Sequence, residues 1–401
     1  MEVGYAFLRE HLQLAVFPVA NPAVIAPVQR VLAGEGRLQV PGRVAPRSAQ
    51  PLDHVLFALK YEGVNLQVLA EAMPHIAPGD LLLRLREAPS SALVRKACYL
   101  GEAFSGQMLE DLPPVRGNYV DLFDPERYLT GAVVKDARWR VNFNGLGDWR
   151  YCPVVERTPA IIEGMQRDIL GRTRDFLQAI GPVNADRALA WAYLSETEQS
   201  FAIERESPSG NKAEAFVALL RQAHERRDLS EDYLVDLQAA SISNPFDRAV
   251  SFRGEQNWLR AGGLRGASSI SFVPPTPSLC ADLMPAFMAM ANRLPATACD
   301  PIVAAAVASF GFVFLHPFMD GNGRLSRFLF QHALCRSGRL AQGLLLPVSV
   351  AMKKNEAAYL AALQAFSRPA RALWEVRWLG DEEFDFRFVG ADAIYRYWDA
   401  T

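Results

Sequence analysis

HPFMDGNGRLSR, residues 316–327, is the stretch of this chain that decides how the rest is interpreted. It places a titratable base, a carboxylate, a Gly-Asn-Gly turn and two arginines close together in the sequence. The Ala-, Val- and Phe-rich run 301–315 before it has the composition of a helix buried on all sides. The segment LSRFLFQHALCRSG after it has helical spacing, with Gly338 as its expected end. The pattern therefore predicts a polar loop between two helices of a helical core.

The glycines and arginines of this loop predict an anion site. Gly321, Asn322 and Gly323 form a flexible turn just ahead of a helix. Such a turn exposes consecutive backbone N–H groups, and the helix dipole adds partial positive charge at the same place. Arg324 and Arg327 are three residues apart, so they lie on one face of that helix and can bind further phosphate oxygens. We expect a site for a polyphosphate.

The two remaining polar residues of the loop suggest what the site does with that phosphate. Asp320 would be repelled by phosphate unless it holds Mg²⁺, which binds through one or two carboxylates and substrate phosphates. His316 can accept a proton near neutral pH and so can deprotonate a hydroxyl nucleophile. Each feature also has a simpler explanation: the glycines could serve a tight turn only, and Arg324 could pair with Asp320 at the surface. Together they favour metal-assisted phosphoryl or nucleotidyl transfer.

The loop also resembles the signature of the Fic family, H-x-F-x-(D/E)-G-N-G-R-x-x-R, and matches it at every specified position. The resemblance implies an all-α fold with a Fic-type helical core. It also implies protein adenylyltransferase activity, the transfer of AMP from Mg·ATP to a serine, threonine or tyrosine hydroxyl of a target protein. On the same resemblance, His316 is the base, Asp320 holds magnesium, residues 321–324 cradle the phosphates, Arg327 reaches the γ-phosphate and Phe318 anchors the loop.

Two segments outside the loop extend the resemblance to residues 190–370. SISFVPPTP, with Ser271, Phe272 and Val273, is similar to the family's flap, a short hairpin at about 265–275 that aligns a target segment by strand addition. The alternative is a surface hairpin without a role. LLPVSVAMKKNEAAYLAAL resembles the helix that lines the nucleotide side, and Tyr359 falls where the family often has an aromatic residue. The comparison does not fix which residues contact adenine.

An upstream segment resembles the inhibitory motif (S/T)-x-x-x-E-(G/N) of many Fic proteins. SFAIER supplies Ser200 and Glu204 at the right spacing, on a helix expected at about 185–206, but Arg205 replaces the final Gly or Asn. The resemblance implies that Glu204 pairs with Arg327 and occupies the space of the γ-phosphate. Arg205 could compete for Glu204 or face water. The alternative is that Glu204 is one of several acids on a solvated helix face, with Glu196, Glu198 and Glu206.

Periodicity and composition divide the chain into four parts. Residues 1–115 are expected to form a mostly helical N-terminal domain of unknown role, and 116–160 a loop-rich connection. Residues 161–375 are expected to form the Fic core, and 376–401 a C-terminal tail. Helices are expected at 161–177, 185–204, 212–226, 231–240 and 279–292.

Composition limits the class of protein. The chain has 401 residues, 50% hydrophobic and 21% charged, with a net charge of −2, so no strong basic balance indicates nucleic acid or an anionic membrane. Five scattered cysteines without metal-site spacing favour free thiols and a cytoplasmic location. The N-terminus lacks the pattern of a signal peptide, and prolines interrupt the uncharged run 11–29, so we expect no membrane span.

Three other functions remain open on the sequence. The same site could transfer phosphate, phosphocholine or UMP, or remove AMP from a protein, although the retained Gly-Asn-Gly-Arg favours ATP and AMP transfer. The protein could also be a regulator that binds a nucleotide without turnover. Residues 52–110 could form a DNA-binding helix-turn-helix, but their helices carry no basic face, so a nucleic-acid partner is not expected. A homo-oligomer is compatible with the sequence.

Overall fold

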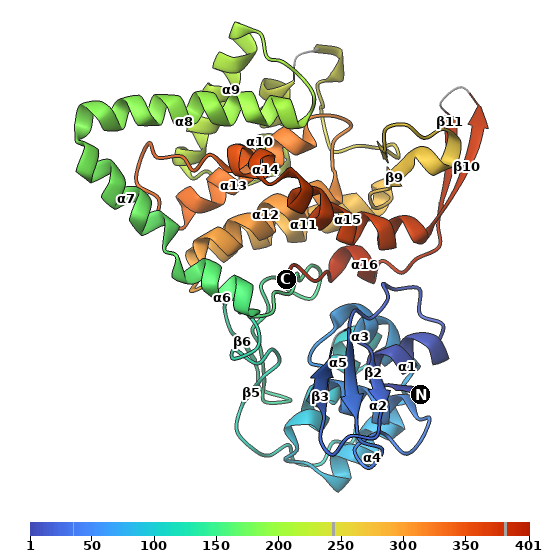
Figure 1. The fold of residues 1–401 in the computed structure, drawn as a ribbon. Helices are drawn as coiled ribbons and strands as arrows, with labels where there is room; N and C mark the ends of the chain where they lie inside the picture. The colour runs from blue at the N-terminus through green and yellow to red at the C-terminus, as the bar shows by residue number, and fades with distance from the viewer. Residues whose placement is uncertain (35, 243–244, 381–382) are drawn as a thin grey trace.

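The computed structural model describes residues 1–34, 36–242, 245–380 and 383–401. Figure 1 shows a small group of N-terminal helices below a larger helical assembly, with the C-terminus between the two. Helices dominate the described residues, and the strands form small sheets. The expected all-α fold with a small hairpin flap is therefore confirmed.

The N-terminal region contains both helices and a sheet. Asn65 and Ser91 cap two of its helices by accepting hydrogen bonds from backbone amides, and Gly106 ends the last one in the left-handed conformation. A four-stranded sheet, ordered β1-β2-β4-β3, lies beside these helices, and the sequence did not predict its strands. The helices are α1 (Gly4–His11), α2 (Pro51–Tyr61), α3 (Leu66–Ala72), α4 (Pro78–Glu87) and α5 (Ala92–Ser105), with the short turn η1 (Met73–His75). The strands are β1 (Glu2–Val3), β2 (Ala23–Ile25), β3 (Leu32–Gly34) and β4 (Arg37–Val40).

The connection at 116–160 is ordered by three short strands, β5 (Val120–Asp121), β6 (Val134–Asp136) and β7 (Val141–Phe143). Strand β7 lies between the other two, parallel to β5 and antiparallel to β6. Trp139 and Tyr151 in this segment are fully buried. The Tyr151 hydroxyl accepts a hydrogen bond from the indole of Trp398 near the C-terminus, so distant parts of the chain meet here.

Helices α12 (Pro301–Leu315) and α13 (Asn322–Arg336) pack against each other at the centre of the larger assembly. Apolar residues surround α12, which explains its composition, and α13 is buried along most of its length. The loop 316–321 joins the two helices. Around them lie α6 (Pro159–Gln166), α7 (Ile169–Ile180), α8 (Pro182–Ile203), α9 (Gly210–Gln222), α10 (Glu231–Ser241), α11 (Pro277–Arg293), α14 (Val348–Lys354) and α15 (Glu356–Ala372), with the 3₁₀ turns η2 (Ala223–Glu225), η3 (Pro245–Asp247), η4 (Gly266–Ser269) and η5 (Leu294–Ala296).

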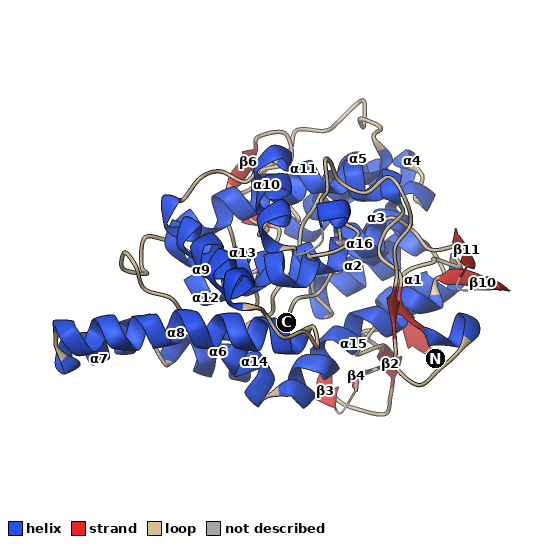
Figure 2. Ribbon diagram, turned by 90° about the horizontal axis from the view of Figure 1, so that it is seen from above, coloured by secondary structure: helices blue, strands red, loops and turns tan. Residues whose placement is uncertain are grey.

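Helix α8 brings the segment with Ser200 and Glu204 to this centre. Its C-terminal half is buried at helical spacing, from Ala192 to Phe201, and packs against α9 and α14. Its N-terminal half continues away from the core and meets α7 at Gly181, so α7 and α8 extend outward in Figure 2. The expected helix 161–177 is divided in two because Asp168 adopts the left-handed conformation between α6 and α7.

The C-terminal residues pack against the flap. The flap strands β8 (Leu259–Arg260) and β9 (Ile270–Phe272) pair antiparallel. Strands β10 (Trp374–Gly380) and β11 (Glu383–Phe388) form a second hairpin, and α16 (Ala393–Arg396) follows. Ile270 and Val273 pack against Trp374 in a small separate core. The range 376–401, expected to be a tail, thus contributes strand, helix and buried aromatic side chains such as Trp398.

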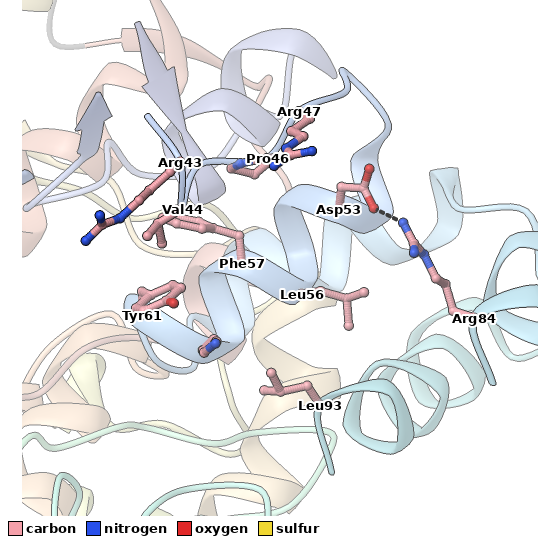
Figure 3. Close-up of a pocket in the computed structure, with 11 residues that line it drawn as sticks. Arg43, Val44, Pro46, Arg47, Asp53, Leu56, Phe57, Tyr61, Arg84 and Leu93 are labelled. Atoms are coloured by element: carbon pink, nitrogen blue, oxygen red, sulfur yellow. Dashed lines mark hydrogen bonds and ion pairs between the residues drawn. The ribbon is translucent and has the colours of Figure 1, made fainter. Parts of the chain in front are cut away.

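Two cavities of similar volume lie in different parts of the molecule. The first, of about 580 Å³, is in the N-terminal region between α2 and the segment 43–47; Asp53 pairs there with Arg84 (Figure 3). The second, of about 570 Å³, lies against Met319 and Asp320 of the signature loop. All five cysteines are buried and unpaired. Within the described part of the chain, no helix is both long and apolar enough to cross a membrane.

Candidate active site

The structure holds His316 in an unusual backbone conformation at the end of α12. Its φ of 52° and ψ of 58° lie in the left-handed region, which costs a non-glycine residue roughly 1–2 kcal/mol. The ring atom Nδ1 lies 3.0 Å from the carbonyl oxygen of Val313. A proton on Nδ1 satisfies that carbonyl, which leaves the lone pair on Nε2 to accept a proton from a nucleophile.

The surroundings of His316 favour its neutral form. Its side chain is almost fully buried, and burial lowers the pKa of His316 to about 4. The bond to Val313 acts in the opposite direction, while the positive charge of Arg253 lowers the pKa further. A neutral imidazole is the form that can act as a base.

The turn between the helices has the geometry of an anion site. Gly321 is the N-cap of α13 with a φ of 85°, a conformation that favours glycine. The amides of the first helical turn, beginning at Asn322, have no acceptor within the helix itself. The Asn322 side chain bonds both backbone groups of Phe318, at 2.7 and 3.0 Å, and fixes the loop. Phe318 is fully buried, as an anchor for the loop must be.

Arg327 is buried against the end of α8 and is bonded there three times. Its Nε donates to Ser200 Oγ at 2.7 Å, and its Nη2 donates to the Ser200 carbonyl at 3.0 Å and to Glu204 Oε1 at 2.8 Å. Arg327 is 1% exposed, so this guanidinium is fully engaged. The three residues that the sequence analysis linked are therefore in direct contact.

The Glu204 carboxylate also covers the glycine turn. A Cβ placed on Gly323 would overlap Glu204 Oε1, so the carboxylate lies directly against the backbone of the turn. The first amides of α13 are at this point, and helix N-termini are places where anions commonly bind. Arg205 is exposed and, within the described residues, forms no ion pair. It is in the left-handed conformation, with a φ of 61°.

Arg324 is paired with a second carboxylate, which the sequence analysis did not single out. Its Nη1 donates to Glu206 Oε2 at 3.1 Å, and its Nη2 lies 3.6 Å from Asp320 Oδ2. The guanidinium also stacks over the Phe201 ring and is only 3% exposed. Its buried Nε atom has no hydrogen-bond partner among the described residues. The pair with Asp320, considered above as a simple explanation, is thus the longer of two ion pairs.

Asp320 has the exposure that a magnesium ligand needs. Its Oδ1 accepts a hydrogen bond from the Gly321 amide at 2.6 Å, and about half of its side chain is exposed. It borders the 570 Å³ cavity described above. One carboxylate beside an open space and a phosphate site suits Mg²⁺, which otherwise takes water and phosphate oxygens. Within the described residues, no group of three or more potential ligands offers a pre-formed metal cage.

The three flap residues lie in different environments. Ser271 is partly exposed and donates its hydroxyl to the Leu259 carbonyl at 3.1 Å, across the hairpin. Phe272 is buried and stacks on Phe314, while Val273 is fully buried. Only backbone groups and the Ser271 side chain of this trio can therefore meet a target segment. Tyr359 on α15 is partly buried, and Arg327 and Glu204 are among the charges that act on its hydroxyl.

Sequence reasoning missed two residues that hold the signature loop. Arg253 Nε donates to the His316 carbonyl at 2.8 Å, and Asn257 Nδ2 donates to the Phe318 carbonyl at 2.8 Å. Both are buried, although they follow a segment without periodicity. The only signal in the sequence was an arginine and an asparagine just ahead of the flap.

An imidazole beside a helix N-terminus with two arginines defines a site that can bind a polyphosphate next to a proton acceptor. Residues 228–334, which include the flap and the signature loop, match the model of the Fic/DOC family. This part of the chain is therefore similar to a Fic domain, in agreement with the signature. Helix α8 lies outside the matched range.

Curated relatives and solved structures with the Fic name are similar to parts of this chain. The proteins named protein adenylyltransferase Fic from Drosophila virilis and Drosophila ananassae are each 42% identical over 66 residues. That match covers 16% of this chain and only 14% and 13% of the two relatives. A Fic family protein from Desulfovibrio desulfuricans G20 is 21% identical, with a TM-score of 0.41, over 53% of this chain and 68% of its own. A segment of Fic-1 from C. elegans is 16% identical, with a TM-score of 0.37, over 80% of this chain and 93% of its own.

Proposed function

We propose that this protein is an adenylyltransferase that moves AMP from Mg·ATP to a serine, threonine or tyrosine hydroxyl of a target protein. The observation that carries the proposal is the position of His316 six residues before the start of α13, with its Nδ1 bonded to the Val313 carbonyl, so that Nε2 can act as the proton acceptor. The names of the Drosophila relatives support the same activity over the short segment that they share with this chain.

The chain's own residues account for the steps of such a transfer. Nε2 of His316 takes the proton of the target hydroxyl, and the hydroxyl oxygen then attacks the α-phosphorus of ATP. A bond forms between that oxygen and phosphorus as the bond from phosphorus to the leaving pyrophosphate breaks. The amides at the start of α13 and Arg324 bind the phosphate oxygens on which charge develops. Magnesium, held through Asp320, would neutralise charge on the phosphates.

We further propose that the form described above is autoinhibited. Glu204 is bonded to Arg327 and lies on the glycine turn, so the γ-phosphate and this carboxylate compete for one place. A hydrogen bond to a charged partner contributes roughly 1.5–3 kcal/mol. Loss of Glu204 should therefore favour productive ATP binding by roughly 10- to 100-fold, since each 1.4 kcal/mol is a factor of ten.

The test uses the full chain with ATP labelled at the α-phosphate, and follows label in the protein itself and in a cell lysate. We expect Glu204→Gly to raise incorporation, and Glu204→Gly with His316→Ala to abolish it while ATP affinity stays nearly the same. Mass spectrometry of the labelled product must show an added adenylyl group. An added phosphate, phosphocholine or uridylyl group would replace AMP transfer with another reaction at this site. ATP binding without any transfer by Glu204→Gly would instead support a non-catalytic regulator.

A further inference from the structure

Arg253 is a buried guanidinium that donates hydrogen bonds to backbone carbonyls and also interacts with the Cys280 thiol. Its side chain donates to the carbonyls of His316, Glu255 and Pro275, and the residue is 6% exposed. Within the described part of the chain, no carboxylate forms an ion pair with it. Burial lowers the pKa of Arg253, which reflects the cost of removing its charge from water. Such a cost needs a structural or functional reason.

The acceptors of Arg253 lie on the strained turn that carries the base. Its Nε bonds the His316 carbonyl at 2.8 Å, and its backbone amide bonds the Pro317 carbonyl at the same distance. Asn257 bonds the next carbonyl, that of Phe318. Three consecutive carbonyls of the loop are thus held by one short segment. These bonds compensate the unfavourable left-handed conformation of His316, which sets the direction of the imidazole.

The same guanidinium reaches the flap. Pro275, which accepts a bond from Arg253 Nη2, lies three residues after the end of β9. Arg253 itself precedes β8, and Gln256 bonds the Pro274 carbonyl at 3.1 Å. The Arg253 side chain therefore connects the loop of the base with the segment that follows β9, in the hairpin to which a target segment would be added.

We propose that Arg253 is a positioning residue: by holding the His316 carbonyl and the Pro275 carbonyl together, it aims the imidazole at the hydroxyl presented by the flap. The proposal rests on the proposed function in so far as His316 is the base. A second effect follows from its charge. Burial is the largest cause that lowers the pKa of His316, and the charge of Arg253 lowers it further, whereas the Val313 bond and the carboxylates of Glu204 and Asp320 raise it.

Arg95 provides a matched control for the structural part of this role. It is also a buried arginine, 3% exposed, and it donates to the carbonyls of Trp139, Arg140 and Asn118. It lies in α5 of the N-terminal region and touches no residue of the signature loop. Loss of a guanidinium that binds three carbonyls should lower stability at either position, but only Arg253 should affect the base.

The experiment compares Arg253→Gln, Arg253→Lys and Arg95→Gln in the Glu204→Gly protein. ¹⁵N-histidine NMR of each protein, with His316 assigned from the spectrum of His316→Ala, reports the tautomer and titration of the imidazole. Transfer kinetics give kcat and the ATP KM separately. For Arg253→Gln we expect kcat to fall roughly 10- to 100-fold, because small misplacements of a reacting group have effects of this size, with little change in ATP KM. We also expect His316 to titrate at higher pH and to lose its single tautomer.

The other variants complete the test. Arg253→Lys should recover part of kcat, because an ammonium keeps the charge and can reach one of the carbonyls. Arg95→Gln should lower the Tm without changing kcat or the His316 spectrum. Unchanged kcat and an unchanged His316 spectrum in Arg253→Gln, or in Arg253→Lys if the glutamine variant does not fold, would overturn the proposal, as would an equal fall of kcat in Arg95→Gln. If no transfer occurs even with Arg253 intact, the proposed function fails, while the NMR result still decides whether Arg253 holds His316.

Discussion

Glu206 Oε2 lies 3.1 Å from Arg324 Nη1. Two positions earlier in the chain, Glu204 Oε1 lies 2.8 Å from Arg327 Nη2. Both arginines of the signature are thus paired with carboxylates from one short segment at the end of α8. The left-handed conformation of Arg205 makes this geometry possible, because it turns the chain between the two acids. The Glu206 amide bonds the Phe201 carbonyl at 3.0 Å and closes the turn. The segment after α8 therefore places two carboxylates on the arginines of the signature, where the sequence indicated one.

Glu206→Gln should increase the apparent affinity for ATP, by less than Glu204→Gly does. The Glu206 side chain is 43% exposed, and a partly solvated ion pair contributes at most about 1 kcal/mol, or roughly fivefold in affinity. The measurement is the ATP KM of transfer, or the Kd of ATP by calorimetry. Glu198→Gln is the control, because Glu198 is an exposed acid of α8 and forms no ion pair with either arginine among the described residues. Equal effects of the two substitutions would show that only net charge matters.

Arg205→Gly should stabilise the protein and leave the inhibition intact. Arg205 has a φ of 61°, and removal of a side chain from this conformation relieves roughly 1 kcal/mol of strain. This strain also explains why the similar family motif has Gly or Asn at the position. The checks are a Tm higher by a few degrees and basal transfer no higher than in the wild type. A clear rise in basal transfer would mean that the exposed Arg205 side chain itself helps to hold Glu204.

The sequence contained enough information for the loop and its two flanking helices because these depend on local spacing, whereas the flap and the segment with Ser200 and Glu204 were expected from the resemblance to the Fic family. The Gly-Asn-Gly turn and the two arginines three apart define the start of α13 without any distant contact. Ser200 and Glu204 are one helical turn apart, so they face the same partner. The buried composition of 301–315 likewise predicted a central helix. What each of these residues does in a reaction remains a proposal.

The contacts that the sequence did not reveal join residues far apart in the chain. Glu206 and Arg324 are separated by 118 positions, and Arg253 and His316 by 63. The alternative that Glu206 lies on a solvated helix face assumed a helix to about residue 206, whereas α8 ends at Ile203 and the chain then turns Glu206 toward Arg324. The strands β1 to β4 are short and pair partly through a parallel arrangement, so alternation over a few residues gave no usable pattern.

Ser200→Ala should release the inhibition only in part. The substitution removes the acceptor of Arg327 Nε but keeps the Ser200 carbonyl and Glu204, which bond Nη2. One buried hydrogen bond to a charged group is lost, so we expect basal transfer to rise by less than in Glu204→Gly. The two variants and the double variant are compared in the same label-incorporation assay. Ser326→Ala is a suitable control, since among the described residues its hydroxyl bonds the Gly323 carbonyl in the same helix and not Arg327.

Non-additive effects of Ser200→Ala and Glu204→Gly would support a single unit around Arg327. Full activation by Ser200→Ala alone would contradict the expectation, because it would make the Glu204 contact dispensable.

Glu196→Gln should make the stability of the protein less dependent on pH. Glu196 is fully buried on α8, and its two oxygens accept hydrogen bonds from the amide and hydroxyl of Ser349 at the start of α14. Burial raises the pKa of Glu196 to about 7, and the bonds from Ser349 and the charge of Arg327 only partly oppose this. Because the pKa of Glu196 is higher in the folded protein than the ordinary 4.5, the protonated side chain contributes to the free energy of unfolding in full below pH 4.5. This contribution is lost as the pH rises through about 7. The size of the loss is at most about 3 kcal/mol, since each pKa unit corresponds to about 1.4 kcal/mol.

The measurement for Glu196 is the difference in Tm between wild type and Glu196→Gln from pH 5 to pH 8. Glutamine has nearly the same shape as a protonated glutamate and can still bond the Ser349 amide and hydroxyl, but it cannot ionise. Contributions of other buried acids, such as Glu62, cancel in this difference. We expect the glutamine variant to be relatively more stable at pH 8 than at pH 5. A difference in Tm that stays constant across the range would show that Glu196 ionises in the folded protein as readily as in the unfolded chain, and that α8 is held to α14 without any penalty from its charge.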